Sequence, residues 1–162
     1  MFPSKITGLY IDRQTGEPVV LLQEEAGGTQ VPIWIRFNEM LALALELSDT
    51  GKRPPRPFSH DLIQTVLRNI DAKVRQVIIS DIQEHIYRAR VFFETNNSIV
   101  EIDARPSDAL VLALKSKAPV FVSEDVVQKQ AQLLEAAGQT DATLRERLQR
   151  FRPEDFTNLS IG

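Results

Sequence analysis

The first third of the chain places hydrophobic residues at alternating positions or in short runs, a pattern typical of β-strands. Three strands are predicted, over residues 6–11, 19–22 and 30–35. Because proline has no backbone N–H to donate to a neighbouring strand, Pro32 indicates that the third strand lies at an edge of its sheet or begins there.

After this region the hydrophobic residues recur at intervals of three and four, which predicts α-helices. Helices are expected over residues 37–47, 59–70 and 107–115, and the chain is expected to be mainly helical over 123–151, with a break at 138–140.

Between the second and third helices the chain returns to strand patterns, over residues 74–79, 86–93 and 99–103, and a short strand is expected at 120–122. The turn at Asn96-Asn97-Ser98 predicts a hairpin, so these three successive strands form an antiparallel meander. Arg88 and Arg90 alternate with apolar neighbours, which indicates that one face of the middle strand meets water. Groups of strands, then helices, then strands favour an α+β fold.

The composition agrees with one ordinary domain, since 43% of the 162 residues are hydrophobic and 25% are charged. Without an apolar run of about 18 residues, no membrane span is expected. The first residues lack the layout of a signal peptide, and a cytoplasmic location is expected. The absence of cysteine rules out disulfides, thiolate metal sites and a cysteine nucleophile.

Charge limits the kind of nucleic-acid binding that the chain can support. The sequence has 19 basic and 22 acidic residues and a net charge of −3, and no third of it is basic. Proteins that bind nucleic acid mainly by neutralising phosphates usually show a basic face or a high pI. Any contact with RNA or DNA is therefore expected to come from a local arginine cluster and to be weak.

One short pattern occurs twice, in segments 56–62 and 103–110. Each copy has Arg-Pro, then a serine, then an aspartate in the first turn of a predicted helix. The structural interpretation is that Ser59 and Ser107 are N-caps and that the aspartates complement the positive helix ends.

The functional interpretation is that both helix starts meet at one cleft. An anion would then bind Arg56 and Arg105, while Asp61, Asp108 and His60 would supply acid–base or metal-binding groups. Carboxylates can hold a divalent cation, magnesium or manganese, that activates water. The two interpretations are compatible, because a helix-capping residue can also line a cleft.

Several segments in order resemble the bifunctional nuclease family, whose plant members act on both RNA and DNA. They are Pro32-Ile33-Trp34-Ile35, Glu39, the two Arg-Pro segments and Ala118-Pro119-Val120-Phe121-Val122. The resemblance covers about residues 5–127. It implies an α+β fold with a mixed, largely antiparallel sheet, a homodimer and nuclease activity, with Glu39 as a further metal ligand and Ser107 beside the phosphate.

The resemblance divides the chain into a nuclease-like domain over residues 1–127 and a helical C-terminal extension over 128–162. Two positions depart from the family pattern: Arg36 stands where glycine is usual, and Met40 where alanine is usual. Arg36 is expected to alter the cleft beside Glu39 or to add a phosphate contact.

Two functions are compatible with the sequence. The first is a weakly binding, metal-assisted nuclease for RNA or DNA. The second is a non-catalytic dimeric module that binds a protein partner or a small anionic ligand, with the arginines and aspartates pairing to support the fold.

Overall fold

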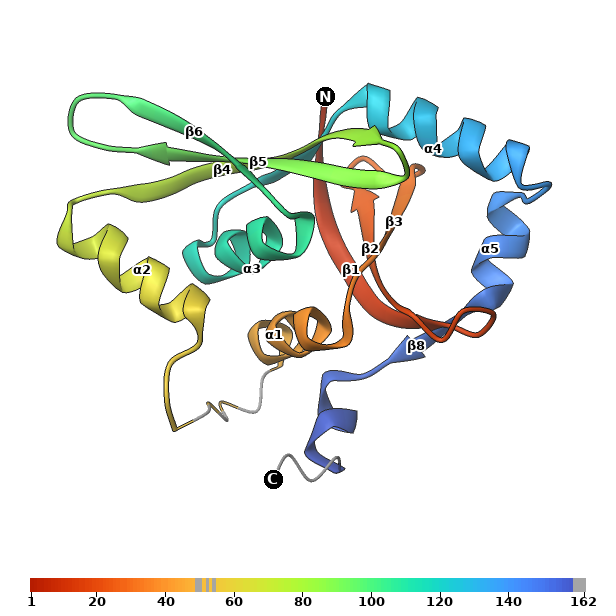
Figure 1. Cartoon of the computed structure of the whole chain (residues 1–162), viewed down its shortest axis with the longest axis horizontal. Coiled ribbons are helices and arrows are strands. Elements are labelled where there is room, and N and C mark those ends of the chain that lie inside the picture. The colour runs from red at the N-terminus through yellow and green to blue at the C-terminus, as the bar shows by residue number, and fades with distance from the viewer. Residues whose placement is uncertain (49–50, 52, 54, 159–162) are drawn as a thin grey trace.

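A computed structural model describes residues 1–48, 51, 53 and 55–158 of the chain (Figure 1). Its strands are β1 (Phe2–Asp12), β2 (Pro18–Glu24), β3 (Gln30–Trp34), β4 (Lys73–Gln83), β5 (Ile86–Glu94), β6 (Ile99–Ala104), β7 (Val120–Val122) and β8 (Leu148–Phe151). Its helices are α1 (Phe37–Leu47), α2 (Ser59–Asn69), α3 (Pro106–Ser116), α4 (Glu124–Ala136) and α5 (Asp141–Arg147), followed by a short 3₁₀ helix at Pro153–Asn158.

All eight strands join one sheet, in the order β3-β2-β1-β7-β4-β5-β6, with β8 beside β1. Only β4 and β7 run parallel, and the other pairs are antiparallel. The predicted α+β fold with a mixed, largely antiparallel sheet is confirmed. The meander of β4, β5 and β6 and the edge position of Pro32 in β3 are confirmed as well.

Strand β1 is shared between two partners on one of its sides. Its first residues, Phe2–Ser4, pair with β7, and its last residues, Leu9–Asp12, pair with β8. A bulge between Ile6 and Gly8 bends the strand, so that its two halves serve different parts of the sheet. Strand β1 thus joins β2, β7 and β8, which lie far apart in the sequence, in one sheet.

Helix α3 lies at the centre of the molecule, between the sheet and the layer formed by α1 and α2 (Figure 1). Its residues Ala109–Ala113 are all buried, which explains the continuous apolar run in its sequence. Pro106 occupies the first helical position, where its missing N–H is not needed. The start of this central helix therefore has a fixed position relative to both layers.

The expectation of helix as far as Phe151 is wrong, because residues Leu148–Phe151 form strand β8. This strand pairs with Leu9–Asp12, and the pairing is fixed by an ion pair between Arg147 and the fully buried Asp12. A long-range partner has overridden the local helical pattern. The predicted domain boundary after residue 127 falls within α4, and the division into two domains stays a prediction.

None of the helices in the described part of the chain has the length and apolar character needed to cross a membrane.

Candidate functional site

Helices α1, α2 and α3 begin close together, and each carries a carboxylate at its third helical position: Glu39, Asp61 and Asp108. A negative charge there is favourable, because the helix start is its positive end. Glu39 also accepts a hydrogen bond from the Arg36 backbone N–H (2.9 Å), and Asp61 accepts one from Phe58 (2.8 Å). These carboxylates therefore have a structural role at the helix starts.

The prediction that Ser59 and Ser107 are N-caps is wrong. The N-cap positions belong to Phe58 and Arg105, and the serines lie one and two residues inside their helices. In α2 the Asp61 carboxylate accepts a hydrogen bond from the backbone N–H of Phe58, the N-cap residue itself. Ser107 is buried and lines the cavity described below.

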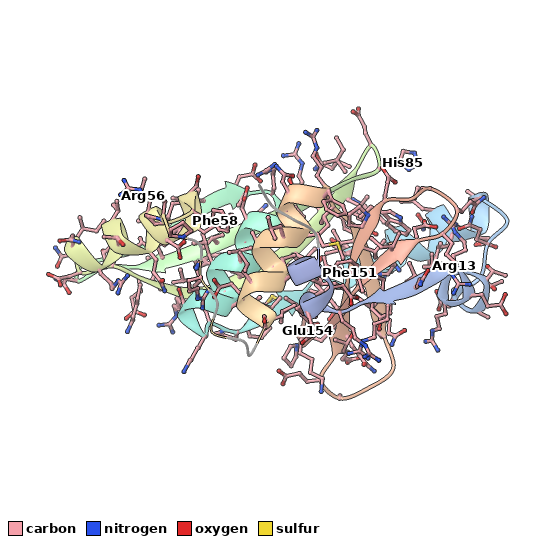
Figure 2. The ribbon with its side chains drawn as sticks, turned by 90° about the horizontal axis from the view of Figure 1, so that it is seen from below. Arg13, Arg56, Phe58, His85, Phe151 and Glu154 are labelled. Carbon is pink, nitrogen blue, oxygen red and sulfur yellow. The ribbon has the colours of Figure 1, made fainter. Side chains whose placement is uncertain are left out.

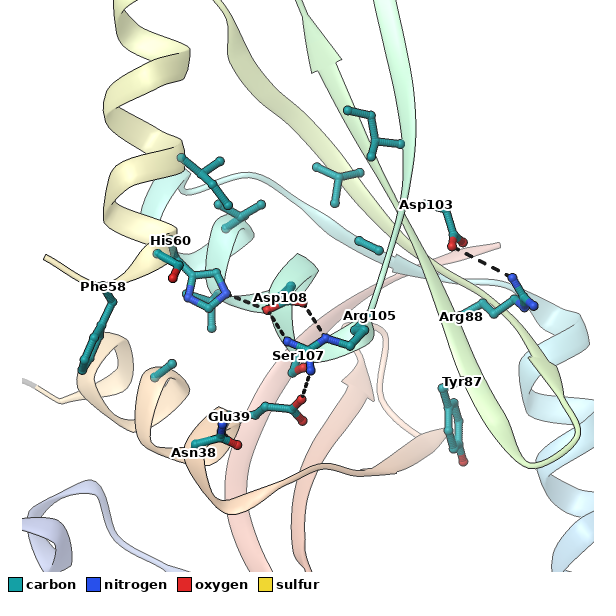
Figure 3. Close-up of a pocket in the computed structure, with 18 of the residues that line it drawn as sticks. Asn38, Glu39, Phe58, His60, Tyr87, Arg88, Asp103, Arg105, Ser107 and Asp108 are labelled. Carbon is teal, nitrogen blue, oxygen red and sulfur yellow. Dashed lines mark hydrogen bonds and ion pairs between the residues drawn. The ribbon is translucent and has the colours of Figure 1, made fainter.

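Asp108 connects the starts of α2 and α3, which the repeated Arg-Pro pattern predicts to meet (Figure 3). Its Oδ1 lies 2.8 Å from Nε2 of His60, and Arg105 donates to both carboxylate oxygens, from Nε at 2.8 Å and from Nη2 at 3.1 Å. Burial alone would raise the pKa of Asp108, but the hydrogen bonds from Arg105 and His60 hold it below its ordinary value. The carboxylate is therefore ionised and orients the His60 ring.

Arg105 also binds Glu39, with Nη1 2.6 Å from Oε1, so one guanidinium bridges two carboxylates. Its side chain remains 62% exposed, whereas that of Glu39 is only 12% exposed. The bridging arginine is thus the group of this cluster most accessible to a ligand from solvent. A phosphate could engage it in the bidentate geometry that guanidinium favours.

The cluster lies at one end of a cavity of about 1070 Å³, which we call the main cavity. Its polar end contains Asn38, Glu39, Ser59, His60, Arg105, Ser107 and Asp108, and its apolar wall contains Ile63, Val91, Phe93, Ile102, Val111 and Leu112. Asp103 and Arg88, which face each other across the hairpin of β5 and β6, lie on its rim. Three carboxylates and two arginines line the cavity, so an anionic substrate is expected to bind weakly.

The structure does not bring two of the predicted site residues into this cluster. Arg56 is exposed beside α2 and is absent from the lining of the main cavity (Figure 2).

Asp61 forms an ion pair with Lys115. The Lys115 side chain, which is only 7% exposed, also binds Glu46 at 2.6 Å. Burial would raise the pKa of Asp61, but the bond from Lys115 lowers it. The two Arg-Pro segments therefore contribute differently: His60 comes from the first, and Arg105, Ser107 and Asp108 from the second.

The predicted metal ligands Glu39, Asp61 and Asp108 do not form a metal site in this arrangement. Arg105 bridges Glu39 and Asp108, and Lys115 holds Asp61 elsewhere. Over the described residues, no group of three or more His, Asp or Glu side chains is arranged to hold a metal ion. In this arrangement a divalent cation would have to displace Arg105 or Lys115 from these carboxylates.

Sequence reasoning missed Tyr87 and Lys115. Tyr87 follows the turn between β4 and β5 and lines the main cavity, and burial raises the pKa of its phenol well above the ordinary value. Lys115 lies on the last turn of α3, where a basic residue is expected for helix stability alone. A short-range pattern gave no signal that Tyr87 would line the cavity or that Lys115 would bind Asp61 at the start of α2.

The fold and the cluster define a class of protein: an α+β domain with a His–Asp pair and an arginine at the polar end of a surface cavity. Sequence comparison places it in a family, because the model of the bifunctional nuclease domain matches residues 20–135. The chain belongs to the bifunctional nuclease domain family.

Two kinds of relative illustrate this membership. An uncharacterized protein of Mycobacterium tuberculosis is 32% identical, and the match covers 94% of this chain and 96% of the relative. Bifunctional nuclease 1 of Arabidopsis thaliana is 27% identical over 65% of this chain, and Bifunctional nuclease 1 of Oryza sativa is 23% identical over 67% of it. Each plant match covers 33% of the relative, so the similarity spans about a third of the length of these plant proteins.

Proposed function

We propose that the protein is a nuclease that hydrolyses phosphodiester bonds of RNA or DNA at the main cavity. The observation that carries the proposal is the His60–Asp108 hydrogen bond beside an exposed arginine at the cavity's polar end. Membership of the bifunctional nuclease domain family and the names of the plant relatives support it.

His60 is the proton-transfer group in this proposal. With the Nε2 proton donated to Asp108, Nδ1 of the neutral ring is left as an acceptor that can take a proton from water. The water oxygen attacks phosphorus, the bond to the leaving oxygen breaks, and that oxygen takes a proton from solvent. Asp108 stabilises the imidazolium that forms, in the role of the carboxylate in other His–Asp pairs.

Arg105 binds the phosphate and stabilises the charge that develops on it. Its guanidinium donates to carboxylates on both sides, so its orientation is fixed before the substrate arrives. Because these carboxylates compete for the same donors, affinity for substrate is expected to be modest.

The test is a nuclease assay of the purified chain on RNA and on single-stranded DNA. Asp108→Asn preserves the shape of the side chain but removes its charge, and we expect it to lower the rate by about a hundredfold. Asp125→Asn, on the exposed first turn of α4, is the matched control and is expected to keep the parent rate. Undiminished activity in Asp108→Asn would assign the hydrolysis to a contaminant or to another site.

The same assay with magnesium, with manganese and with a chelator reports whether a metal ion takes part. A second candidate function is binding of a small anion at the exposed Arg105 without hydrolysis, because the pairing of Arg105 with Glu39 and Asp108 already gives these three residues a structural role. It predicts ligand binding by a chain that shows no turnover under any of these conditions.

We also propose that two copies of the chain associate through the exposed apolar residues of α2 and β6, two elements that flank the main cavity. Helix α2 buries no residue completely, and its Leu62, Val66 and Ile70 are exposed. Strand β6 ends the sheet and exposes Ile99, Val100 and Ile102. Its charged residues Glu101 and Asp103 already pair with Arg90 and Arg88, so two such edges can approach without uncompensated like charges.

Val66→Glu is expected to convert a dimer into a monomer, because it places a charge at the centre of this apolar face. Sedimentation velocity measures the change. Thr65→Glu adds the same charge to a neighbouring exposed position of α2 and is the control, expected to leave the dimer intact. A parent chain that sediments as a monomer at all concentrations would disprove the association.

A further inference from the structure

A second cavity, of about 500 Å³, adjoins the main one. It lies between α4, the end of β3, the turn from β4 to β5 and the starts of α1 and α3. The two cavities share Glu39, Ile86, Tyr87, Arg105 and Ser107, so they meet at the bridging arginine. A ligand held by Arg105 can therefore extend from one cavity into the other.

Arginines stand at the N-cap positions of two helices that face this second cavity, Arg36 before α1 and Arg105 before α3. Both side chains are exposed to solvent. Each helix start adds its own positive end to the guanidinium. The mouth of the cavity is thus suited to an anionic group.

The interior of the second cavity is apolar and partly aromatic. Leu133 and Leu134 of α4 line it together with Trp34 and Tyr87. The Trp34 indole N–H donates to Asp12 Oδ2 at 3.1 Å, so the ring is held in place. The Tyr87 phenol is uncharged at neutral pH and does not repel an anion, and burial raises its pKa further. A flat, uncharged ring system fits such walls.

Gln130 gives the cavity an unused polar group. It lies on α4, is 7% exposed, and its side-chain Nε2 donates to the Gln30 carbonyl at 3.5 Å. Its Oε1 is buried and, within the described part of the chain, accepts no hydrogen bond. A buried acceptor without a donor is unfavourable. Oε1 is closed off from solvent, and a rotation of the side-chain amide that turns it into the cavity would let an N–H group of a ligand satisfy it.

We propose that the second cavity binds the nucleoside part of a nucleotide whose phosphate lies between Arg105 and Arg36. A phosphate suits the arginines, a base suits the aromatic and aliphatic walls, and the N–H donors of a base suit Gln130. The volume lies within the range of about 300–1,000 Å³ for small-ligand sites. This inference rests on the proposed function, and it names the part of the substrate that the chain recognises next to the hydrolysed bond.

The test is binding of adenosine monophosphate and uridine monophosphate to the full chain, measured by calorimetry and by the fluorescence of Trp34, the one tryptophan of the sequence. Both nucleotides are expected to bind and to change the emission. Adenosine alone and inorganic phosphate alone are each expected to bind about tenfold more weakly or worse, because each fills half of the site. Equal affinity for inorganic phosphate and for the nucleotides would overturn the proposal.

Leu134→Glu introduces a negative charge into the cavity and is expected to weaken nucleotide binding by about tenfold or more. Gln132→Glu adds the same charge to an exposed position of α4 and is expected to leave binding within about twofold. Gln130→Met keeps the side-chain length without the acceptor and is expected to weaken nucleotide binding but not phosphate binding. If Gln130→Met and Leu134→Glu both bind nucleotides like the parent chain, the nucleoside does not occupy this cavity.

His60→Ala separates this inference from the proposed function. The variant lacks the proton-transfer group but keeps the second cavity, which His60 does not line. Nucleotide binding retained by this variant supports the inference whether or not the parent chain hydrolyses RNA or DNA. Loss of hydrolysis with intact binding separates catalysis from recognition.

Discussion

Replacing His60 by alanine is expected to lower the rate of phosphodiester hydrolysis by about a hundredfold to ten-thousandfold, the range attributed to a positioned acid–base group. The ring is bound to Asp108 at 2.8 Å, and its side chain is 15% exposed, so it is held in place yet can reach water in the main cavity. Single-turnover hydrolysis of a labelled oligonucleotide measures the loss.

The control for this prediction is Arg68→Ala, an exposed position on the same helix, which is expected to keep the parent rate. Thermal unfolding of both variants shows whether α2 remains folded. If His60→Ala hydrolyses the oligonucleotide at the parent rate, His60 has no part in proton transfer, and the His60–Asp108 bond serves only to join α2 to α3.

Replacing Asp12 by alanine is expected to reduce the free energy of unfolding by about 3–5 kcal/mol, the cost of breaking one partner of a buried ion pair. Asp12 is fully buried and accepts hydrogen bonds from Arg147, from Trp34 and from the Gln14 backbone N–H. Without it the Arg147 guanidinium, 19% exposed, would remain without its main partner. Urea unfolding followed by Trp34 fluorescence measures the change.

The same pair predicts a pH dependence of stability. Burial would raise the pKa of Asp12, but the hydrogen bonds from Arg147, Gln14 and Trp34 lower it below the ordinary value of 3.8. The Asp12 carboxylate therefore binds a proton more readily in the unfolded chain than in the folded one. The stabilisation that ionised Asp12 contributes is complete above pH 3.8 and is lost as the pH falls through the pKa of Asp12 in the folded state. The free energy of unfolding of Asp12→Asn should therefore depend less on pH in this acidic range than that of the parent chain. An unchanged pH dependence would contradict the assignment of this effect to Asp12.

The sequence predicted most elements of the fold, because their hydrophobic periodicity is local. The edge position of Pro32 and the water-facing arginines of β5 also follow from local rules. Strand β8 did not follow, since residues 148–151 become a strand only by pairing with Leu9–Asp12, more than a hundred residues away in the sequence. The serine caps failed because each helix begins earlier than the residue pattern shows, with Phe58 and Arg105 at the N-cap positions.

The candidate site was predictable in part. Two segments with the same pattern indicated that helix starts meet, and His60 and Asp108, 48 residues apart, are hydrogen-bonded. The pattern did not indicate that Lys115 would attract Asp61, or that α4 would contribute Gln130 to a cavity wall. These arrangements depend on how helices pack in three dimensions, and their roles in catalysis and binding stay predictions until they are tested.

The divided pairing of β1 has a consequence for how the protein is made. Residues near the N-terminus must wait for partners at residues 120–122 and 148–151 before the sheet can close. Residues 148–151 are synthesised more than a hundred residues after β1, so the edge of β1 at Leu9–Asp12 stays unpaired while the intervening chain emerges from the ribosome. We expect sheet closure to be a slow, late event, since contacts between distant parts of a chain slow folding.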